Sequence, residues 1–367
     1  MSGADSGLAP NILHVLPGDE AREVIAHFGL KLRHTLVTPD GVLPTGLNRS
    51  AYLKPANDFP ALEGLPTPGR MQKLARAMTP FDLVLTYGYE ALDVAMAHTL
   101  FKDAMNLPPL IHHELEPDAS GSFKRKWYRR IALGKAAGLV VPSERLEGTA
   151  LVDWQQPMGR VKRIAPGIDT KRFAKRPKKD GFRLIKREGE LWLGASLTPS
   201  DEAQLLMLIE RFAELDPAWQ LVVLGDDLKT GTVEAVIERH GIDDRVYFPG
   251  EVKDPAKVLG LFDIHVQLGE PDGFPERTVE VMAAGVPILA PRGGEVEQVV
   301  ADENREWLFD TGGNETLAAN LRAFVADKGL RSRLGEANRL RAVRQFDREH
   351  SLATYRRLYT SAMKREF

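Results

Sequence analysis

Short apolar runs alternate with stretches of helical periodicity along the whole chain. The segment 11–16 is mostly apolar, as in a strand buried on both faces, whereas 21–30 repeats its apolar residues at helical spacing. Strands that alternate with helices predict parallel βαβ units and open, doubly wound sheets. Strands are predicted at 11–16, 34–38, 82–86, 109–112, 138–141 and 160–165, and again at 191–193, 220–224, 245–248, 264–266 and 286–290.

The helical pattern fills the intervals between these strands. A polar, proline-rich stretch up to about residue 69 breaks the alternation in the first half, and a charged segment at 171–181 has the composition of an interdomain linker. Helices are predicted at 21–30, 70–78, 91–105, 123–136, 144–154, 201–214, 232–240, 255–261, 276–284, 295–300 and 316–326, and through most of 330–365.

Residues 270–294, EPDGFPERTVEVMAAGVPILAPRGG, form the most informative segment. A Gly-Phe-Pro turn leads into a short helix that starts with Pro275 at its first position and ends before Gly285. A helix start with free backbone N–H groups is a site for an anion. Two carboxylates, Asp272 and Glu280, bracket it with seven residues between them. The alternative is a solvated acidic helix face, but this alternative does not explain the Gly-Phe-Pro and Gly-x-Pro motifs on either side of the helix.

This segment resembles the donor-site signature of retaining glycosyltransferases of family 4, written E-G-F-P-x-x-x-x-E-A-M-A-x-G-x-P. Here it reads D-G-F-P-E-R-T-V-E-V-M-A-A-G-V-P, so the first glutamate is replaced by Asp272. Other stretches resemble further landmarks of that family and extend the resemblance over nearly the whole chain. They are 136–143, 164–173, 221–226 and 245–250.

The resemblance implies an α/β protein of the GT-B fold, with two Rossmann-like, doubly wound parallel-sheet domains facing a central cleft. We expect an N-terminal acceptor-side domain at 1–173, a linker at 174–183 and a C-terminal nucleotide-sugar domain at 184–345. The last helix, 346–367, is expected to cross back to the N-terminal domain. The nucleotide is expected at the carboxyl ends of the strands, in the cleft between the domains.

The resemblance also implies the roles of single residues. Glu280 would accept hydrogen bonds from the ribose hydroxyls as an ionised acid, and Asp272 would contact the hydroxyls of the donor sugar. In the first domain, His113 at a strand exit would contact the sugar or polarise the phosphate, whereas His112 points the other way and is expected to pack.

The remaining predicted contacts lie around the helix start. Gly273, Phe274 and Pro275 would shape the loop that approaches the sugar and the phosphates. The amides of Glu276 and Arg277 would donate to phosphate, and Gly250 would read the base through backbone atoms. No metal and no catalytic nucleophile is implied.

One departure from the family affects the diphosphate. The family clamps the diphosphate with an Arg and a Lys, but Ser196 and Asp201 stand at these positions. A charge-assisted contact contributes about 1.5–3 kcal/mol, so losing two weakens nucleotide binding by orders of magnitude. Three interpretations remain open: Arg277 or Arg292 replaces the clamp, a helix N-terminus near 200–201 holds phosphate by backbone alone, or the protein is a degenerate scaffold without turnover.

The segment 123–131 is basic with interleaved aromatic residues. It predicts contact with anionic lipid head groups or with a lipid-diphosphate acceptor; alternatively it is a solvated helix face with Trp127 and Ile131 in the core. The basic side chains of this segment are Lys124, Arg125, Lys126, Arg129 and Arg130.

The first β–α loop keeps only Gly18 where relatives often have a glycine pair, and its acidic neighbours disfavour an anionic acceptor there.

Composition narrows the remaining choices. The formal net charge of −2 gives no bulk electrostatic case for nucleic acid. The lack of cysteine excludes disulfides and thiolate chemistry and fits a cytoplasmic protein; contact with the inner face of the membrane stays open. The function predicted is hexosyl transfer from a nucleotide sugar, UDP first and GDP next, to a glycan or lipid-linked acceptor in cell-envelope polysaccharide or glycoconjugate synthesis. The alternatives are a GT-B pseudo-enzyme that acts as a scaffold and a GT-B epimerase.

Overall fold

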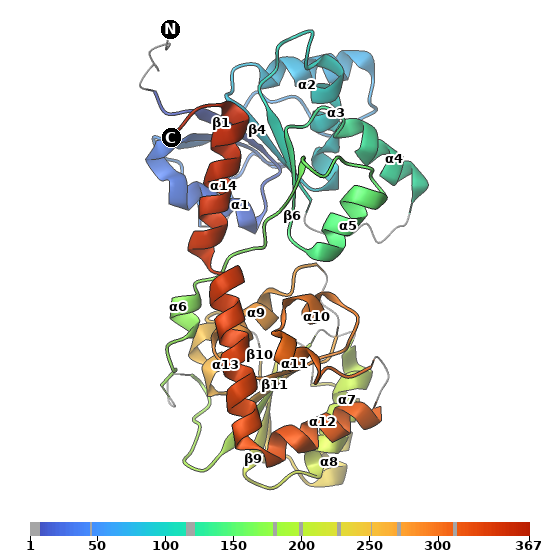
Figure 1. Cartoon of the computed structure of the whole chain (residues 1–367), viewed down its shortest axis with the longest axis vertical. Coiled ribbons are helices and arrows are strands. Elements are labelled where there is room, and N and C mark those ends of the chain that lie inside the picture. Colours follow the sequence, from blue (N-terminus) through green and yellow to red (C-terminus); the bar gives the residue numbers. More distant parts are fainter. Residues whose placement is uncertain are drawn as a thin grey trace. The chain divides into compact units, whose positions relative to one another are not determined.

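The computed structural model divides the chain into two compact units (Figure 1). The first comprises Met1–Pro166 with Glu349–Phe367, and the second comprises Gly167–Arg348. The expected boundary at residue 173 lies seven residues after Pro166, and the one at residue 345 lies three residues before Arg348. The structure describes residues 8–44, 46–114, 122–178, 182–197, 201–225, 229–250, 252–269, 273–310 and 314–367.

The first unit is built on a parallel sheet. Within its described residues, seven strands run in the order β3-β2-β1-β4-β5-β6-β7, and every pair is parallel. Their near-continuous apolar runs reflect burial on both faces. The strands are β1 (Asn11–Val15), β2 (Arg33–Val37), β3 (Leu53–Pro55), β4 (Leu83–Tyr87), β5 (Leu110–His113), β6 (Gly138–Val141) and β7 (Val161–Arg163).

Helices cover this sheet and create two apolar cores. One core contains Trp154, which is fully buried. The other joins Ile12 and Phe28 to Leu352 and Tyr359, so the C-terminal helix completes the first unit, and Figure 1 shows this helix beside α1 and β1. The helices are α1 (Asp19–Phe28), α2 (Pro68–Met78), α3 (Leu92–Phe101), α4 (Phe123–Ala132), α5 (Glu144–Val152) and α14 (Arg348–Met363), with the 3-10 turns η1 (Gly29–Lys31) and η2 (Tyr89–Ala91).

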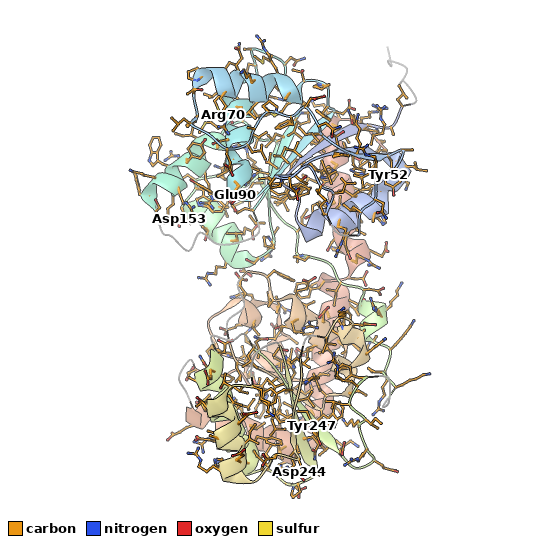
Figure 2. The ribbon with its side chains drawn as sticks, turned by 180° about the vertical axis from the view of Figure 1, so that it is seen from behind. Tyr52, Arg70, Glu90, Asp153, Asp244 and Tyr247 are labelled. Carbon is orange, nitrogen blue, oxygen red and sulfur yellow. The ribbon has the colours of Figure 1, made fainter. Side chains whose placement is uncertain are left out.

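The second unit has its own parallel sheet. Among the described residues, five strands run in the order β10-β9-β8-β11-β12. Val246 begins the paired part of β10. The next residue, Tyr247, donates its hydroxyl to the carbonyl of Asp244 at 2.7 Å, and Figure 2 labels both residues. The strands are β8 (Leu191–Ser196), β9 (Trp219–Leu224), β10 (Val246–Gly250), β11 (Ile264–Gln267) and β12 (Ile288–Leu289).

Two glycines allow very close packing in this unit. A Cβ at Gly194 would lie 2.3 Å from the ring of Phe262, and a Cβ at Gly335 would lie 2.1 Å from the carbonyl oxygen of Gly285. The second contact brings α13 against the end of α9, which positions the signature helix. The helices are α6 (Thr170–Phe173), α7 (Glu202–Ala213), α8 (Gly231–His240), α9 (Glu276–Ala283), α10 (Glu295–Val299), α11 (Asp302–Arg305), α12 (Asn314–Ala326) and α13 (Lys328–Gln345), with η4 (Pro255–Lys257) and η5 (Leu259–Leu261).

Several predicted elements need correction. The proline-rich stretch contains the edge strand β3, and the charged segment at 171–181 begins with α6, whose Phe173 is buried. The segment predicted as a helix at 255–261 forms the two 3-10 turns, and the helical region at 330–365 is interrupted at Phe346. The composition of these two segments did not predict β3 and α6, because each element depends on a few contacts with other parts of the chain.

Each sheet has a point where the strand order reverses. In the first sheet β1 pairs with both β2 and β4, and in the second sheet β8 pairs with both β9 and β11. Ligands of open α/β sheets bind outside the carboxyl ends of the strands at such a point. Each unit therefore has its own candidate ligand-binding edge.

Candidate functional site

The signature segment lies at the carboxyl edge of the second sheet. The strand β11 ends at Gln267, and α9 begins at Glu276 after the turn. Gly273 adopts φ 85°, a conformation that favours glycine. The ring of Phe274 packs on Phe346 with centroids 5.8 Å apart, which fixes the turn against the end of α13. Predicted at the first helical position, Pro275 is in fact the N-cap residue of α9.

Glu280 lies on α9, one turn from its start, and its side chain is 16% exposed. Its Oε2 accepts a hydrogen bond from Nη1 of Arg277 at 2.7 Å. Burial nevertheless raises the pKa of Glu280 to about 7, with nearby Glu276 adding to the rise and Arg277 opposing it. A group whose charge is held near the balance point at neutral pH is typical of a functional site.

The surroundings of Glu280 include residues that sequence reasoning missed. Arg172 on α6 and Asp254 both act on the pKa of Glu280, in opposite directions. They form an ion pair with each other at 2.7 Å. Arg172 lies in the segment taken for a linker, where its Lys- and Arg-rich neighbours conceal it. The sequence did offer one signal, because Asp169 is a common N-cap residue type directly before 170–173. In the structure its side chain accepts a hydrogen bond from the amide of Arg172 and caps α6.

The start of α9 offers less free backbone than predicted. The amide of Glu276 already donates to the carbonyl of Phe274 at 2.9 Å, whereas the amide of Arg277 lies in the first turn, where helix geometry leaves donors without helical acceptors. Gly250 ends β10 with φ 73°, in line with a backbone that turns sharply there. The predicted sugar contact Asp272 lies outside the described residues.

The positions of the missing clamp are both described. Ser196 ends β8, is 8% exposed, and its hydroxyl has no hydrogen-bond partner among the described residues. The carboxylate of Asp201 lies against the backbone of Gly269, where an added Cβ would be 2.2 Å from it. A hydroxyl donor and an anion therefore stand at the two positions where the resemblance leads us to expect cations.

Arg292 has several acidic and carbonyl partners. Its guanidinium contacts the carbonyl of Leu308 at 3.2 Å, Glu297 at 3.5 Å and Asp310 at 3.7 Å. The side chain is 42% exposed. Both proposed replacements for the clamp therefore already have acidic partners, Arg277 in Glu280 and Arg292 in Glu297 and Asp310.

The two adjacent histidines of β5, His112 and His113, are both buried. The ring of His113 stacks on Tyr87 with centroids 4.5 Å apart and also faces Tyr355 at 5.9 Å. Burial lowers its pKa to about 3. His112 bonds to the hydroxyl of Thr86 at 2.9 Å. The prediction that His113 contacts a sugar gains no support from this packing, because its ring is only 1% exposed.

The basic helix α4 differs from the solvated-face interpretation. Trp127 is 50% exposed and Ile131 41% exposed, so their expected place in the core is wrong. Among the charged residues of α4, Arg129 is buried, and its Nε donates to Glu114 at 2.8 Å. Lys126 pairs with Asp153 at 2.9 Å. Apolar side chains are usually buried and charged ones exposed. In α4 the reverse holds, because Arg129 is buried and paired with Glu114, whereas Phe123, Trp127 and Ile131 form an exposed stripe.

Comparisons with known proteins agree with this architecture. Residues 200–341 match the family of glycosyl transferases group 1. The chain is 26% identical over 145 residues to N-acetyl-alpha-D-glucosaminyl L-malate synthase of Bacillus anthracis, covering 40% of this chain and 38% of that protein. It is 29% identical over 154 residues to the lipopolysaccharide core biosynthesis glycosyltransferase LpsE of Rhizobium meliloti, covering 42% of this chain and 45% of that protein.

A solved structure matches over nearly the full length. HepE of Anabaena, crystallised in complex with UDP, superposes with a TM-score of 0.72 at 16% identity, covering 96% of this chain and 100% of that one. The fold is therefore GT-B, with two Rossmann-like units. The alignments with the two curated relatives above span less than half of each relative, so their activities bear on this chain only as a proposal.

Proposed function

We propose that this chain is a glycosyltransferase that moves a hexose from a nucleotide sugar to a glycan or lipid-linked acceptor, with retention of configuration, in polysaccharide or glycoconjugate synthesis. One observation carries the proposal. The carboxyl of Glu280, whose pKa burial raises to about 7, lies one turn into α9 at the carboxyl edge of a parallel sheet. It lies within the residues that match the glycosyl transferases of group 1. UDP is the first candidate nucleotide, a choice supported by the UDP complex of HepE, and GDP is the second.

Donor binding would rearrange the ion pair at α9. Two ribose hydroxyls would replace Arg277 on Glu280, and each would donate to an ionised oxygen. The released guanidinium would then face the diphosphate beside the helix N-terminus, where it and the helix dipole stabilise negative charge as the sugar leaves. The same exchange explains how the chain would work without the family's Arg and Lys clamp.

The Ser196 hydroxyl would add a neutral donor at the same edge. Its lack of a partner among the described residues supports this role. Asp272 would hold the donor sugar, as the resemblance implies. By the same resemblance the departing diphosphate itself assists attack by the acceptor, and no metal is required.

Calorimetric titration of the full chain with UDP, GDP and a panel of nucleotide sugars tests the proposal. We expect micromolar binding of one nucleotide, release of that nucleotide on turnover, and loss of both in Glu280→Ala. The matched control is Glu238→Ala, which removes an exposed glutamate from α8 of the same unit and should leave both unchanged. Intact affinity and turnover in Glu280→Ala would refute the ribose assignment.

A second candidate function is a GT-B scaffold that binds a partner without turnover. The observation that favours it is the pair Ser196 and Asp201, because an anion now rests on the edge where the diphosphate would lie. Millimolar or absent binding of every nucleotide in the same titration supports the scaffold. Micromolar binding with turnover eliminates it.

Peripheral membrane contact is a further part of the proposal. Phe123, Trp127 and Ile131 follow each other at four-residue spacing and are all exposed, and Lys124 and Arg130 lie next to that stripe. Such a face suits the interface of an anionic bilayer. Among the described residues no helix is long and apolar enough to cross a membrane.

Sedimentation with vesicles distinguishes the possibilities for α4. We expect binding to vesicles that contain phosphatidylglycerol, little binding to phosphatidylcholine alone, and loss of binding in Trp127→Ser. Equal recovery of the protein in the supernatant with both vesicle types would refute the proposed contact of α4 with anionic lipid.

A further inference from the structure

A large cavity opens at the carboxyl edge of the first sheet. Its volume is about 1070 Å³, and it lies entirely within the first unit. Leu16 follows β1, Val37 ends β2, and Tyr89 follows β4. These three strands meet where the strand order reverses, which is where ligands of open α/β sheets bind. The volume matches the upper end of ligand pockets, so the cavity has room for more than one sugar ring.

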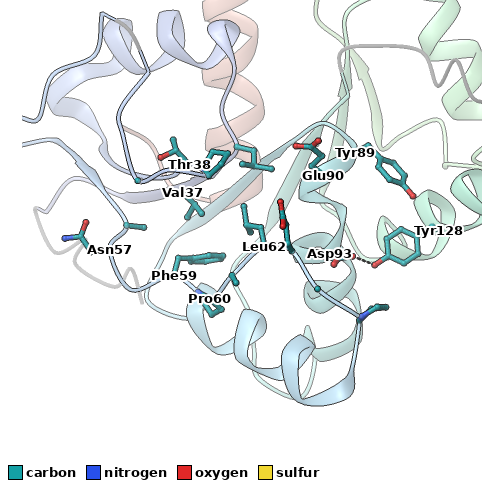
Figure 3. Close-up of a pocket in the computed structure, with 18 of the residues that line it drawn as sticks. Val37, Thr38, Asn57, Phe59, Pro60, Leu62, Tyr89, Glu90, Asp93 and Tyr128 are labelled. Carbon is teal, nitrogen blue, oxygen red and sulfur yellow. Dashed lines mark hydrogen bonds between the residues drawn. The ribbon is translucent and has the colours of Figure 1, made fainter.

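The cavity has an apolar and partly aromatic lining. Phe59, Pro60 and Leu62 come from the loop after β3, while Tyr89 and Tyr128 come from the opposite wall (Figure 3). This loop belongs to the stretch that composition alone marks as featureless. Flat aromatic faces offer apolar contact to the C–H faces of sugar rings, and the hydroxyl groups of tyrosines keep a polar tip for hydrogen bonds.

A hydrogen-bond network fixes the two walls to each other. Arg70 donates to Asp93 at 2.5 Å and also to the carbonyl of Leu62, so one guanidinium joins the loop to α3. Tyr128 donates its hydroxyl to the other oxygen of Asp93. Burial and this carboxylate raise the pKa of Tyr128, which stays neutral. The charge of Asp93 is therefore compensated within the wall.

The charges that remain at the cavity are acidic. Glu63 and Glu90 line it and are exposed, and neither has an ion-pair partner among the described residues. Arg125 is the one cation among the described lining residues, and its guanidinium already lies over the ring of Tyr89, 4.2 Å from the centroid. Figure 2 shows Arg70 and Glu90 in the same unit. Two uncompensated carboxylates against one guanidinium leave the lining net negative, so a phosphate or carboxylate in this space would meet more like charge than opposite charge.

We propose that this cavity is the acceptor site and that it selects uncharged sugar rings while rejecting anionic ones, a lipid diphosphate or a sugar phosphate included. The inference rests on the proposed function. Sugar hydroxyls donate to Glu63 and Glu90, and Phe59, Tyr89 and Tyr128 cover the apolar faces of the rings. The acceptor is thus the neutral end of a glycan, and the basic side chains of α4 do not serve as an acceptor clamp.

A glycan array probed with the full-length protein in the absence of donor tests the inference. The array carries neutral oligosaccharides beside sialylated or phosphorylated versions of the same chains. We expect some neutral glycans to bind and their anionic counterparts to bind at least tenfold more weakly. The double variant Glu63→Gln, Glu90→Gln should reduce this discrimination to less than threefold, because repulsion is removed while both amides still accept hydrogen bonds.

Glu366→Gln, which removes an exposed carboxylate of the same unit outside the cavity, should leave the discrimination unchanged. Equal or stronger binding of the anionic versions, or no binding to any glycan, overturns the inference. Titration of the same samples with UDP and GDP separates the two proposals. A protein that binds nucleotide but prefers anionic glycans refutes the acceptor assignment alone, whereas a protein that binds no nucleotide refutes the proposed function.

Discussion

The affinity for a nucleotide sugar should rise with pH through the titration of one side chain, Glu280. Burial places the pKa of this carboxyl at about 7 in the folded protein, so about a tenth of the molecules carry the ionised form at pH 6 and about nine-tenths at pH 8. If the ribose hydroxyls bind the ionised form, affinity rises about tenfold across this interval, equivalent to about 1.4 kcal/mol.

The assay is calorimetric titration with UDP-glucose at pH 6, 7 and 8 in buffers of different ionisation enthalpy. UDP-glucose is the correct probe because its diphosphate is esterified at both ends, whereas the terminal phosphate of UDP has its own titration near pH 6. Proton release on binding at pH 6 is expected, because the ligand requires the ionised carboxylate. The variant Glu280→Gln should bind weakly and show no dependence on pH.

The same variant has a second, independent readout. The pKa of Glu280 rises from 4.5 to about 7 on folding, so the folded protein loses stability as pH rises from 4.5 towards 7 and keeps that deficit above it. Removing the charge in Glu280→Gln should therefore stabilise the second unit at pH 8 by about 3 kcal/mol. A variant that lost both affinity and stability would show that the binding defect reflects misfolding. An affinity of the wild type that stays flat from pH 6 to 8 would refute the reasoning.

Three further outcomes follow from packing and burial. Gly194→Ala should destabilise the second unit by about 1–3 kcal/mol in urea melts, because its Cβ would lie 2.3 Å from the ring of Phe262. Gly148→Ala, with open space around it on α5, should instead stabilise the first unit by about 0.5–1 kcal/mol; equal effects would contradict the packing argument. Acidification from pH 7 to pH 5 should lower the free energy of unfolding of the first unit by about 2 kcal/mol for each of His34 and His113. Burial lowers their pKa to about 4 and about 3 in the folded protein, whereas the unfolded chain takes up protons below pH 6.5. Unfolding midpoints that stay the same at both pH values would contradict this prediction. Arg70→Ala should cost about 2 kcal/mol and speed proteolysis of the loop after β3, since both of its partners lose their donor; a protease-resistant loop would disprove its anchoring role.

Hydrophobic periodicity was sufficient for most of the fold. The alternation of apolar runs and helical stretches located β6 without error and most other strands within one or two residues, because strands buried on both faces leave continuous apolar runs. It missed β3 and α6, whose few residues have no periodic signal. Their conformation depends on other parts of the chain: β3 pairs with β2, and α6 packs against α9.

The candidate site was predictable in part. The spacing of Gly273, Pro275 and Glu280 identifies the turn and the helix from sequence alone. The raised pKa of Glu280 and its pairing with Arg277 need the surrounding elements, since burial by packing sets the cost of charge. The alternative that placed Trp127 in the core is wrong, and Arg129, expected among the basic side chains that contact lipid, is buried. The sequence could not show this, because the partner of Arg129, Glu114, comes from another part of the chain.

Sequence alone determined the parallel α/β architecture, the position of the helix at 276–283, and the presence of Ser196 and Asp201 where the resemblance implies two cations. Each of these depends on local spacing and residue type. Tertiary structure decided how the residues between β2 and α2 come to face the start of α3 and α4 across one cavity. It also decided which carboxylates of that cavity have an ion-pair partner among the described residues and which do not. Those properties arise from desolvation and from charges brought together by folding, and neither can be read from the order of residues along a single segment.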